Sequence, residues 1–212
     1  MDHLSESMTG RLRHCGSDGA ELIVNRASYG PRGAGARMQY TIAPSPFGRL
    51  LIAATAHGVC WIGIHDSAEH LESELRGDFP QATIGRDDTT TGDFARRVVS
   101  SITNEPTGLD LPLDIRATPF QLAVWRELCA IPRGATRSYG AIAQRIGRPD
   151  APRAVGHANG SNPLAIVIPC HRAIGANGTL TGYRWGIEIK RRLLEAEGTI
   201  TQRSSLSLDR AL

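Results

Sequence analysis

The pattern of hydrophobic and polar residues changes at about residue 38. Residues 1–37 are rich in Gly, Arg and Ser and show no sustained periodicity, so we expect much of this segment to be mobile, with a linker-like stretch at 30–37. Beyond it, runs with the composition of β-strands alternate with stretches whose apolar residues recur at helical spacing. The expected extended segments are 38–43, 49–55, 58–64 and 109–115, and the expected helices are 66–79 and 90–102. This pattern predicts a small α/β unit over residues 38–116.

A second unit is expected over residues 117–198, followed by a C-terminal tail at 199–212. Its first helix begins at Thr118, where Thr118 and Gln121 are spaced as a capping box and Pro119 takes the first helical position. Two short helices across a tight turn indicate a helix-turn-helix. The remaining expectations are helices at 138–147, 151–160 and 186–198, a buried strand at 164–168 and a turn at 175–179.

Composition limits the class of protein. The chain of 212 residues is 41% hydrophobic and has a mean hydropathy of −0.22, which is ordinary for a soluble globular protein. We find no apolar stretch long enough to span a membrane and no signal peptide, so we expect a cytoplasmic protein without a membrane partner. The four cysteines are widely spread and fit reduced thiols, and no group of Cys and His residues has the spacing of a metal site.

The net charge of +3 conceals an asymmetry between the two expected units. Residues 38–116 carry 6 Arg against 11 Asp and Glu, which gives −5, whereas residues 117–198 carry 11 Arg and Lys against 5 Asp and Glu, which gives +6. A basic unit joined to an acidic one suggests that the second unit meets a polyanion such as nucleic acid. A chance imbalance of surface charge is the alternative.

The helix expected at 151–160 lacks the long polar side chains that read base edges in a major groove. Most of its residues are small, and Arg153 projects among them. Such a face permits close approach of the backbone, which suits a minor groove. It suits equally well a tight packing against a neighbouring helix, and the pattern leaves both interpretations open.

Candidate chemistry lies in the sequence LAIVIPCHR at 164–172, where Cys170 and His171 follow an apolar run. A thiol becomes a nucleophile when it is ionised, and a nearby His can act as its base. Adjacent residues at a strand end point to opposite sides, so we expect His171 to reach Cys170 through a water. Glu197 is a candidate for the third group that orients the imidazole. From these residues alone, a buried structural cysteine beside an unrelated histidine is the alternative.

The flanking sequence is more specific. The stretches TPFQLAVW, SYGAIAQRIG, RAVGHANGSNPLAIVIPCHR, TGYRWG and LLEAEG resemble the O6-alkylguanine-DNA alkyltransferase family, the methylated-DNA–protein-cysteine methyltransferases, and most of all the methyltransferase half of bacterial adaptive-response regulators. The resemblance runs from about Met38 to Gly198. It implies an α/β (α+β) fold, in which a small N-terminal sheet-plus-helix (ribonuclease H-like) domain precedes a helical, winged helix-turn-helix-like DNA-binding catalytic domain.

The resemblance also implies a role for each matching residue. Cys170 would accept the alkyl group, His171 would act as its base through a water, and Glu197 would orient His171. Asn162 would be a hinge between the recognition helix and the active-site segment, and Tyr139 would contact the flipped nucleotide and help to protonate the departing guanine at N3. The DNA-binding residues would be Arg153, which fills the space left by the base, with Tyr139, Pro152, Ala154 and Gly156. The pocket would be formed by Pro169, Ala173, Tyr183, Arg184 and Trp185, and the backbones of Cys170, Ala173 and Arg184 would hydrogen-bond the base.

The partner implied by this resemblance is double-stranded DNA containing O6-alkylguanine, bound by a monomer that flips the damaged base out of the helix. Transfer of the methyl group to Cys170, from O6-methylguanine and also from O4-methylthymine, would be irreversible and would consume the protein without a cofactor or a metal. Bound to DNA, the protein would be associated with the nucleoid. A non-catalytic protein that flags alkylated DNA for other repair is one alternative, and such proteins usually have another residue at the cysteine position. A Cys-His hydrolase is a second alternative, without independent support.

Overall fold

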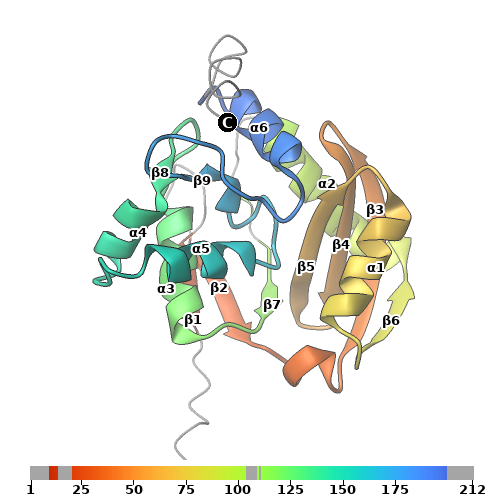
Figure 1. The fold of residues 1–212 in the computed structure, drawn as a ribbon. Coiled ribbons are helices and arrows are strands. Elements are labelled where there is room, and N and C mark those ends of the chain that lie inside the picture. Colours follow the sequence, from red (N-terminus) through yellow and green to blue (C-terminus); the bar gives the residue numbers. More distant parts are fainter. Residues whose placement is uncertain (1–9, 14–20, 104–108, 110, 200–212) are drawn as a thin grey trace, which may run out of the picture.

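The computed structural model describes residues 10–13, 21–103, 109 and 111–199, and it places a mixed sheet beside a cluster of short helices (Figure 1). The strands are β1 (Gly10–Arg13), β2 (Glu21–Arg26), β3 (Arg37–Ser45), β4 (Gly48–Thr55), β5 (Gly58–His65), β6 (Thr83–Arg86), β7 (Leu113–Ile115), β8 (Arg137–Ser138) and β9 (Ala173–Ile174). The helices are α1 (Ala68–Asp78), α2 (Asp88–Thr103), α3 (Pro119–Cys129), α4 (Tyr139–Arg145), α5 (Pro152–Gly160) and α6 (Ile187–Ala196), with 3-10 turns η1 (Pro31–Gly33) and η2 (Cys170–Arg172). Within these residues, no helix is long and apolar enough to cross a membrane.

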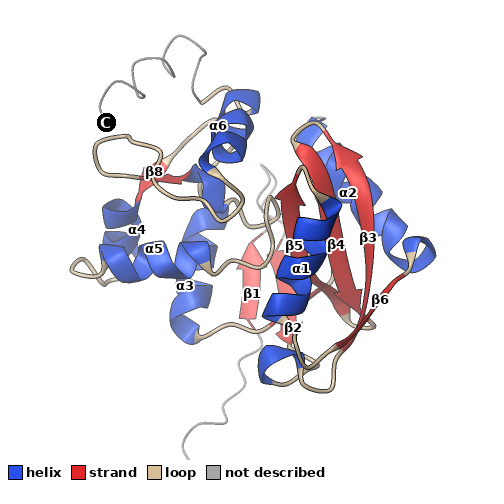
Figure 2. Cartoon of the chain, turned by 45° about the vertical axis from the view of Figure 1, so that its right-hand side comes forward, coloured by secondary structure: helices blue, strands red, loops and turns tan. Residues whose placement is uncertain are grey.

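The larger sheet has seven strands in the order β1-β2-β7-β5-β4-β3-β6. The strands β3, β4 and β5 form an antiparallel meander, whereas β6 pairs parallel to β3 and β7 pairs parallel to β5. Helix α1 lies on one face of this meander and α2 on the other, as both views show (Figures 1 and 2). Because both faces are covered, β4 and β5 are apolar along almost their whole length and nearly every residue in them is buried. The predicted α/β class is confirmed.

The prediction of a mobile segment over residues 1–37 is wrong where the structure describes it. Strand β2 pairs with β7 and β1 pairs with β2, so both extend the sheet. The linker-like stretch contains η1 and is held by backbone bonds from Gln81 N to Arg32 O at 3.1 Å and from Thr83 N to Ala36 O at 2.9 Å. Gly33 has a φ of +82°, which favours glycine, so the glycines here serve a fixed turn rather than flexibility. The parts of this prediction at 1–9 and 14–20, and the tail at 200–212, lie outside the described residues.

The helical part of the molecule begins where the sequence predicts. The Thr118 hydroxyl accepts from Gln121 N at 3.2 Å, and the Gln121 side chain accepts from Thr118 N at 2.8 Å, which completes the capping box of α3. The short helices α4 and α5 form the expected helix-turn-helix, and Trp125 Nε1 of α3 donates to Ala158 O of α5 at 2.9 Å. Strands β8 and β9 pair beside α4, in the place of a wing. The predicted capping box and helix-turn-helix are therefore confirmed.

The buried strand predicted at 164–168 is wrong. Leu164 makes a single isolated bridge to Ile62 of β5, and residues 165–167 form a turn in which Ile166 has a φ of +73°. Backbone bonds from Ile62 N to Pro163 O at 2.7 Å and from Ala165 N to Ile62 O at 3.1 Å attach this turn to the sheet. A short apolar run fits a buried turn as well as a buried strand, because burial alone sets its composition.

Candidate active site

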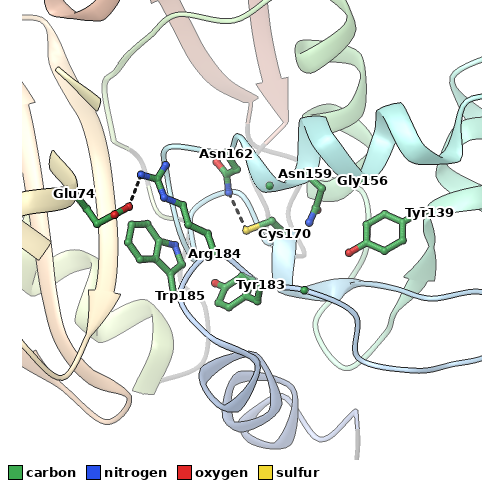
Figure 3. Close-up of a pocket in the computed structure, with 11 residues that line it drawn as sticks. Glu74, Tyr139, Gly156, Asn159, Asn162, Cys170, Tyr183, Arg184 and Trp185 are labelled. Atoms are coloured by element: carbon green, nitrogen blue, oxygen red, sulfur yellow. Dashed lines mark hydrogen bonds and ion pairs between the residues drawn. The ribbon is translucent and has the colours of Figure 1, made fainter. Parts of the chain in front are cut away.

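The Cys170 thiol lines a cavity of about 560 Å³, to which the sheet part and the helical part both contribute residues (Figure 3). Cys170 is the first residue of η2 and is only 4% exposed. The turn at 164–168 directs it there, because that turn is attached to β5 on one side and leads into η2 on the other. The cavity is lined by Glu74, Tyr139, Gly156, Asn159, Gly160, Asn162, Cys170, Gly182, Tyr183, Arg184 and Trp185.

The Asn162 side chain fixes the path of the chain to the thiol. Its Nδ2 donates to Cys170 Sγ at 3.1 Å, to Ile168 O at 2.9 Å and to Leu164 O at 3.2 Å. Its Oδ1 accepts from Leu164 N at 2.9 Å. One buried carboxamide thus holds both ends of the turn and touches the sulfur. Asn162 also follows α5 directly, as the hinge interpretation requires.

His171 and Glu197 meet in the interior, as the sequence suggested. His171 Nε2 lies 3.0 Å from Glu197 Oε1. Arg172 holds the same carboxylate with two bonds, from Nε at 2.9 Å and from Nη2 at 2.8 Å, and its Nη1 donates to Ile131 O at 2.7 Å. Burial raises the pKa of Glu197, but the hydrogen bonds from His171 and Arg172 outweigh burial and lower the pKa to about 2. The carboxylate is therefore ionised at neutral pH.

The protonation state of His171 follows from this environment. Burial lowers the pKa of His171 below its ordinary value, although Glu197 acts in the opposite direction. A neutral imidazole carries one proton, and the ionised Glu197 can only accept, so the proton lies on Nε2. The other ring nitrogen, Nδ1, is buried and has no hydrogen-bond partner in the described part of the chain. It is left with a free lone pair, which is what a general base needs.

The thiol itself is protonated at rest. Burial raises the pKa of Cys170, while hydrogen bonding from Asn162 and the charge of Lys190 act against it. Lys190 is fully buried, and its Nζ donates to Ala173 O at 2.6 Å and to Thr181 O at 3.0 Å. Burial lowers the pKa of Lys190 to about 8. Lys190 was not among the residues predicted from sequence, where it is one of several charged residues in the last helix.

Helix α5 presents a small, exposed face beside the cavity. Pro152, Arg153 and Ala154 are exposed and Gly156 is half-buried, whereas Val155 and Ala158 are buried on the opposite side. The buried side packs on α3 and α4. Tight packing therefore uses only one face of the helix, and the face of small residues around Arg153 is free to approach another molecule.

The loop of residues 182–185 forms one wall of the cavity, and ion pairs with helix α1 hold it in place. We call the pairs of Arg184 with Glu74 and Asp78 the clamp. Arg184 Nη2 lies 2.9 Å from Glu74 Oε2 and 2.7 Å from Asp78 Oδ2, both in α1 (Figure 3 shows the Glu74 pair). The Arg184 guanidinium also lies over the ring of Trp185, 4.8 Å from its centroid. Trp61 of β5 stacks edge-on against Trp185 at 5.2 Å and donates to Asp78 Oδ2 at 2.7 Å.

Most of the residues named from sequence come together here, and some do not. Tyr183, Arg184 and Trp185 line the cavity, as does Tyr139, whose hydroxyl accepts from Thr181 Oγ1 at 3.4 Å. Pro169 and Ala173 are buried and are not among the residues that line the cavity. The sequence analysis missed the lining residues Glu74, Asn159, Gly160 and Gly182. Glu74 could not be found from sequence, since it is contributed by the other part of the fold.

The site combines a buried thiol, an imidazole that is paired with Glu197, and a helix-turn-helix whose helix α5 has an exposed face of small residues. Together these features define a DNA-binding protein with a reactive cysteine. Family models agree: residues 38–115 match the 6-O-methylguanine DNA methyltransferase, ribonuclease-like domain, and residues 119–199 match the 6-O-methylguanine DNA methyltransferase, DNA binding domain. The chain belongs to the 6-O-methylguanine DNA methyltransferase family.

Individual relatives are consistent with this assignment. The methylated-DNA–protein-cysteine methyltransferase of Mycobacterium tuberculosis H37Rv is 61% identical over 163 residues, which cover 76% of this chain and 92% of the relative. The bifunctional transcriptional activator/DNA repair enzyme Ada of Escherichia coli K12 is 43% identical over 166 residues, covering 78% of this chain but only 47% of the relative. This chain therefore spans about half the length of Ada. A crystal structure of M. tuberculosis OGT in complex with DNA superposes with a TM-score of 0.62 and 39% identity, covering 77% of this chain and 93% of that one.

Proposed function

We propose that the protein repairs O6-methylguanine in double-stranded DNA by moving the methyl group to Cys170. The observation that carries this proposal is the buried Cys170 thiol that lines a cavity, next in sequence to a histidine whose Nδ1 is buried without a hydrogen-bond partner among the described residues. The free face of α5 next to the cavity and the basic charge of residues 117–198 suit DNA. The methylated oxygen lies inside a duplex, so the base has to be flipped into the cavity.

The transfer step is an in-line displacement at the methyl carbon. His171 Nδ1 takes the thiol proton through a bridging water, and the sulfur forms a bond to the methyl carbon as the bond from that carbon to O6 breaks. The electron pair of the broken bond stays on guanine. Tyr139 lines the cavity, and burial raises its pKa, so its hydroxyl is protonated and can donate to N3 of the departing base. Glu197 acts through His171 as a positioning residue.

The product explains why the protein would act once. A thioether is stable, and the transfer consumes the thiol, so each molecule would repair one lesion without a cofactor. The backbones of Cys170 and Arg184 would hold the base, whereas both backbone groups of Ala173, which was also expected to do so, are already bonded, to Lys190 and to Cys170. Arg153 would occupy the space that the base leaves in the duplex, with Pro152, Ala154 and Gly156 against the minor groove. We place this chemistry in a domain of residues 117–198, supported by a domain of residues 38–116. The clamp between Arg184 and α1 joins the two.

The substrate also determines where the protein would act. Its DNA lies in the nucleoid, so we infer that a monomer works there, in the cytoplasm. O4-methylthymine is a second substrate to be tested, since it also carries a methyl group on an exocyclic oxygen. Retention of Cys170 in the cavity gives no reason to favour a non-catalytic lesion-binding role.

Stoichiometry tests this proposal. A fixed amount of protein is mixed with increasing amounts of a duplex that contains one O6-methylguanine, and restored guanine is counted by chromatography of the digested DNA. We expect restoration to stop at one guanine per protein molecule. Continued turnover would contradict single use, and absence of restoration would contradict the proposed repair.

A further inference from the structure

The side chain of Asn159 is the unexplained polar group of the cavity. Asn159 lies on α5, is 4% exposed, and lines the cavity with Cys170. Its Oδ1 is buried and has no hydrogen-bond partner among the residues that the structure describes. A buried carboxamide without a partner is costly, by about 1–3 kcal/mol, so such a group calls for an explanation.

Two other polar side chains of the cavity are already engaged, whereas the Tyr183 hydroxyl, like Asn159 Oδ1, is buried without a hydrogen-bond partner among the described residues. Glu74 is paired with Arg184, and Asn162 is bonded to Cys170. The Tyr183 hydroxyl is buried next to the thiol, whose proximity adds to the effect of burial in raising the pKa of Tyr183. Asn159 differs from Glu74 and Asn162 because, in the part of the chain that the structure describes, its Oδ1 has no partner. Figure 3 shows its side chain directed from α5 toward the space between Cys170 and Tyr139.

The surroundings of Asn159 leave room for a flat ligand. Its neighbours on the cavity side of α5 are Gly156 and Gly160, and Gly182 lies in the loop that also lines the cavity. A Cβ atom added to any of these three glycines would meet nothing within 4 Å. The wall around Asn159 is therefore bare backbone with open space in front of it, and the carboxamide is the group that a ligand would meet there.

We propose that Asn159 is a specificity-determining residue that reads the 2-amino edge of the flipped guanine. A carboxamide offers one acceptor and one donor side by side, and guanine presents the complementary pair in its 2-amino group and an adjacent ring nitrogen. No hydrogen bond to a described residue fixes Oδ1, so the carboxamide can rotate to place Oδ1 toward the amino group. Thymine and hypoxanthine lack this amino group. This inference rests on the proposed function and adds to it a preference for O6-methylguanine over O4-methylthymine.

The test compares two duplexes that differ only in the amino group. One carries O6-methylguanine and the other O6-methylhypoxanthine, and single-turnover rate constants for methyl transfer are measured with each. The variants are Asn159→Leu, which keeps the volume and removes both hydrogen-bonding groups, and Asn159→Asp, which keeps the acceptor. Thermal unfolding of each variant verifies that it is folded. For each protein, the rate constant on the O6-methylguanine duplex is divided by that on the O6-methylhypoxanthine duplex. A general loss of activity lowers both rate constants and leaves this ratio unchanged.

We expect Asn159→Leu to slow transfer from O6-methylguanine by about tenfold, the size of one good base contact, and to change the hypoxanthine rate by less than about twofold. The ratio of the rate constant on the O6-methylguanine duplex to that on the O6-methylhypoxanthine duplex should be larger for Asn159→Asp than for Asn159→Leu. If Asn159→Leu slowed transfer equally on both duplexes, the ratio of the two rate constants would be that of the wild type. That result would overturn the inference while the repair function stands. Equal ratios for the two variants would also overturn it, because the acceptor would then have no role. If wild-type protein transfers no methyl group at all, both the proposed function and this inference fail.

Discussion

His171 Nε2 and Glu197 Oε1 lie 3.0 Å apart, and the two side chains are only 2% and 7% exposed. Arg172, next in sequence to His171, holds the same carboxylate. This arrangement keeps Glu197 ionised and fixes the imidazole proton on Nε2, so that Nδ1 is free to accept a proton. A base of this kind is needed because burial keeps the Cys170 thiol protonated at rest.

The rate of methyl transfer should therefore depend on pH in a particular way. Only neutral His171 can accept the thiol proton, and its pKa lies below the ordinary value of 6.5. We expect the single-turnover rate at saturating DNA to stay level as the pH falls through 6.5 and to decline only in more acidic solution. The exposed His57, changed in His57→Gln, serves as a control with the wild-type profile. A decline with its midpoint above pH 6.5 would argue against His171 as the base.

Glu197 should contribute to stability as well as to catalysis. In Glu197→Gln, His171 and Arg172 lose a buried charged partner, and we expect a loss of about 3–5 kcal/mol in the free energy of unfolding at pH 7. The pKa of Glu197 is depressed from 4.5 to about 2, so its contribution is complete above pH 4.5 and is lost as the pH falls toward 2. The difference between the proteins should thus shrink between pH 5 and pH 3.

Urea unfolding at several pH values measures this difference. The control is Glu188→Gln on the same helix; the Glu188 side chain is 70% exposed, and its 3.5 Å ion pair with Arg191 should contribute less than about 1 kcal/mol at any pH. If the loss from Glu197→Gln were the same at pH 3 and pH 7, the depressed pKa would not describe this carboxylate.

The clamp on the pocket loop predicts an effect from the sheet domain. In Asp78→Asn the side chain can still accept from Trp61, but the charge that holds Arg184 is removed. We expect the transfer rate to fall about fivefold, equivalent to about 1 kcal/mol, with unchanged affinity for DNA. Single-turnover kinetics and DNA titration separate the two quantities. Asp93→Asn, which removes an exposed pair in α2, should change neither, and a wild-type rate in Asp78→Asn would show that the clamp is dispensable.

Arg153 should matter for DNA and not for the chemistry of the thiol. Its side chain is exposed on α5, so Arg153→Ala should alter stability by no more than about 0.5 kcal/mol. We expect weaker binding to the duplex, with a salt slope reduced by about 1, and slower repair in DNA. Reaction with free O6-benzylguanine, which needs no base flipping, should keep its rate. If Arg153→Ala slowed reaction with the free base as much as repair in DNA, a role in DNA binding would be contradicted. The matched control is Arg96→Ala on α2, which should leave both rates unchanged.

The sequence was informative wherever a local pattern determines structure. The capping box at Thr118, the meander strands and the helix-turn-helix depend on residues close in sequence, and all three were predicted correctly. Cys170, His171 and Glu197 were candidates from the residues themselves, and the family resemblance gave each a role; the structure brings His171 and Glu197 within 3.0 Å. Their distance of 26 positions in sequence could not show this by itself.

The errors have physical causes. The run at 164–168 is apolar because it is buried, and burial does not distinguish a turn from a strand. The glycines at 30–37 suggested flexibility, but Gly33 serves a backbone conformation that other residues rarely adopt. Asn159 and Glu74 were missed because their importance depends on what faces them across the cavity. An unpaired carboxamide is visible only when every neighbour is in place.

The central claim is that Cys170 takes the methyl group and keeps it. Intact-protein mass spectrometry tests it after mixing one equivalent of duplex containing a single O6-methylguanine with wild-type protein or with Cys170→Ala. We predict a gain of one methylene mass, about 14 Da, that saturates at one per chain, maps to Cys170 and is absent from the variant. Tight binding of the lesion without a change in mass, or a gain in mass that persists in Cys170→Ala, would contradict the account.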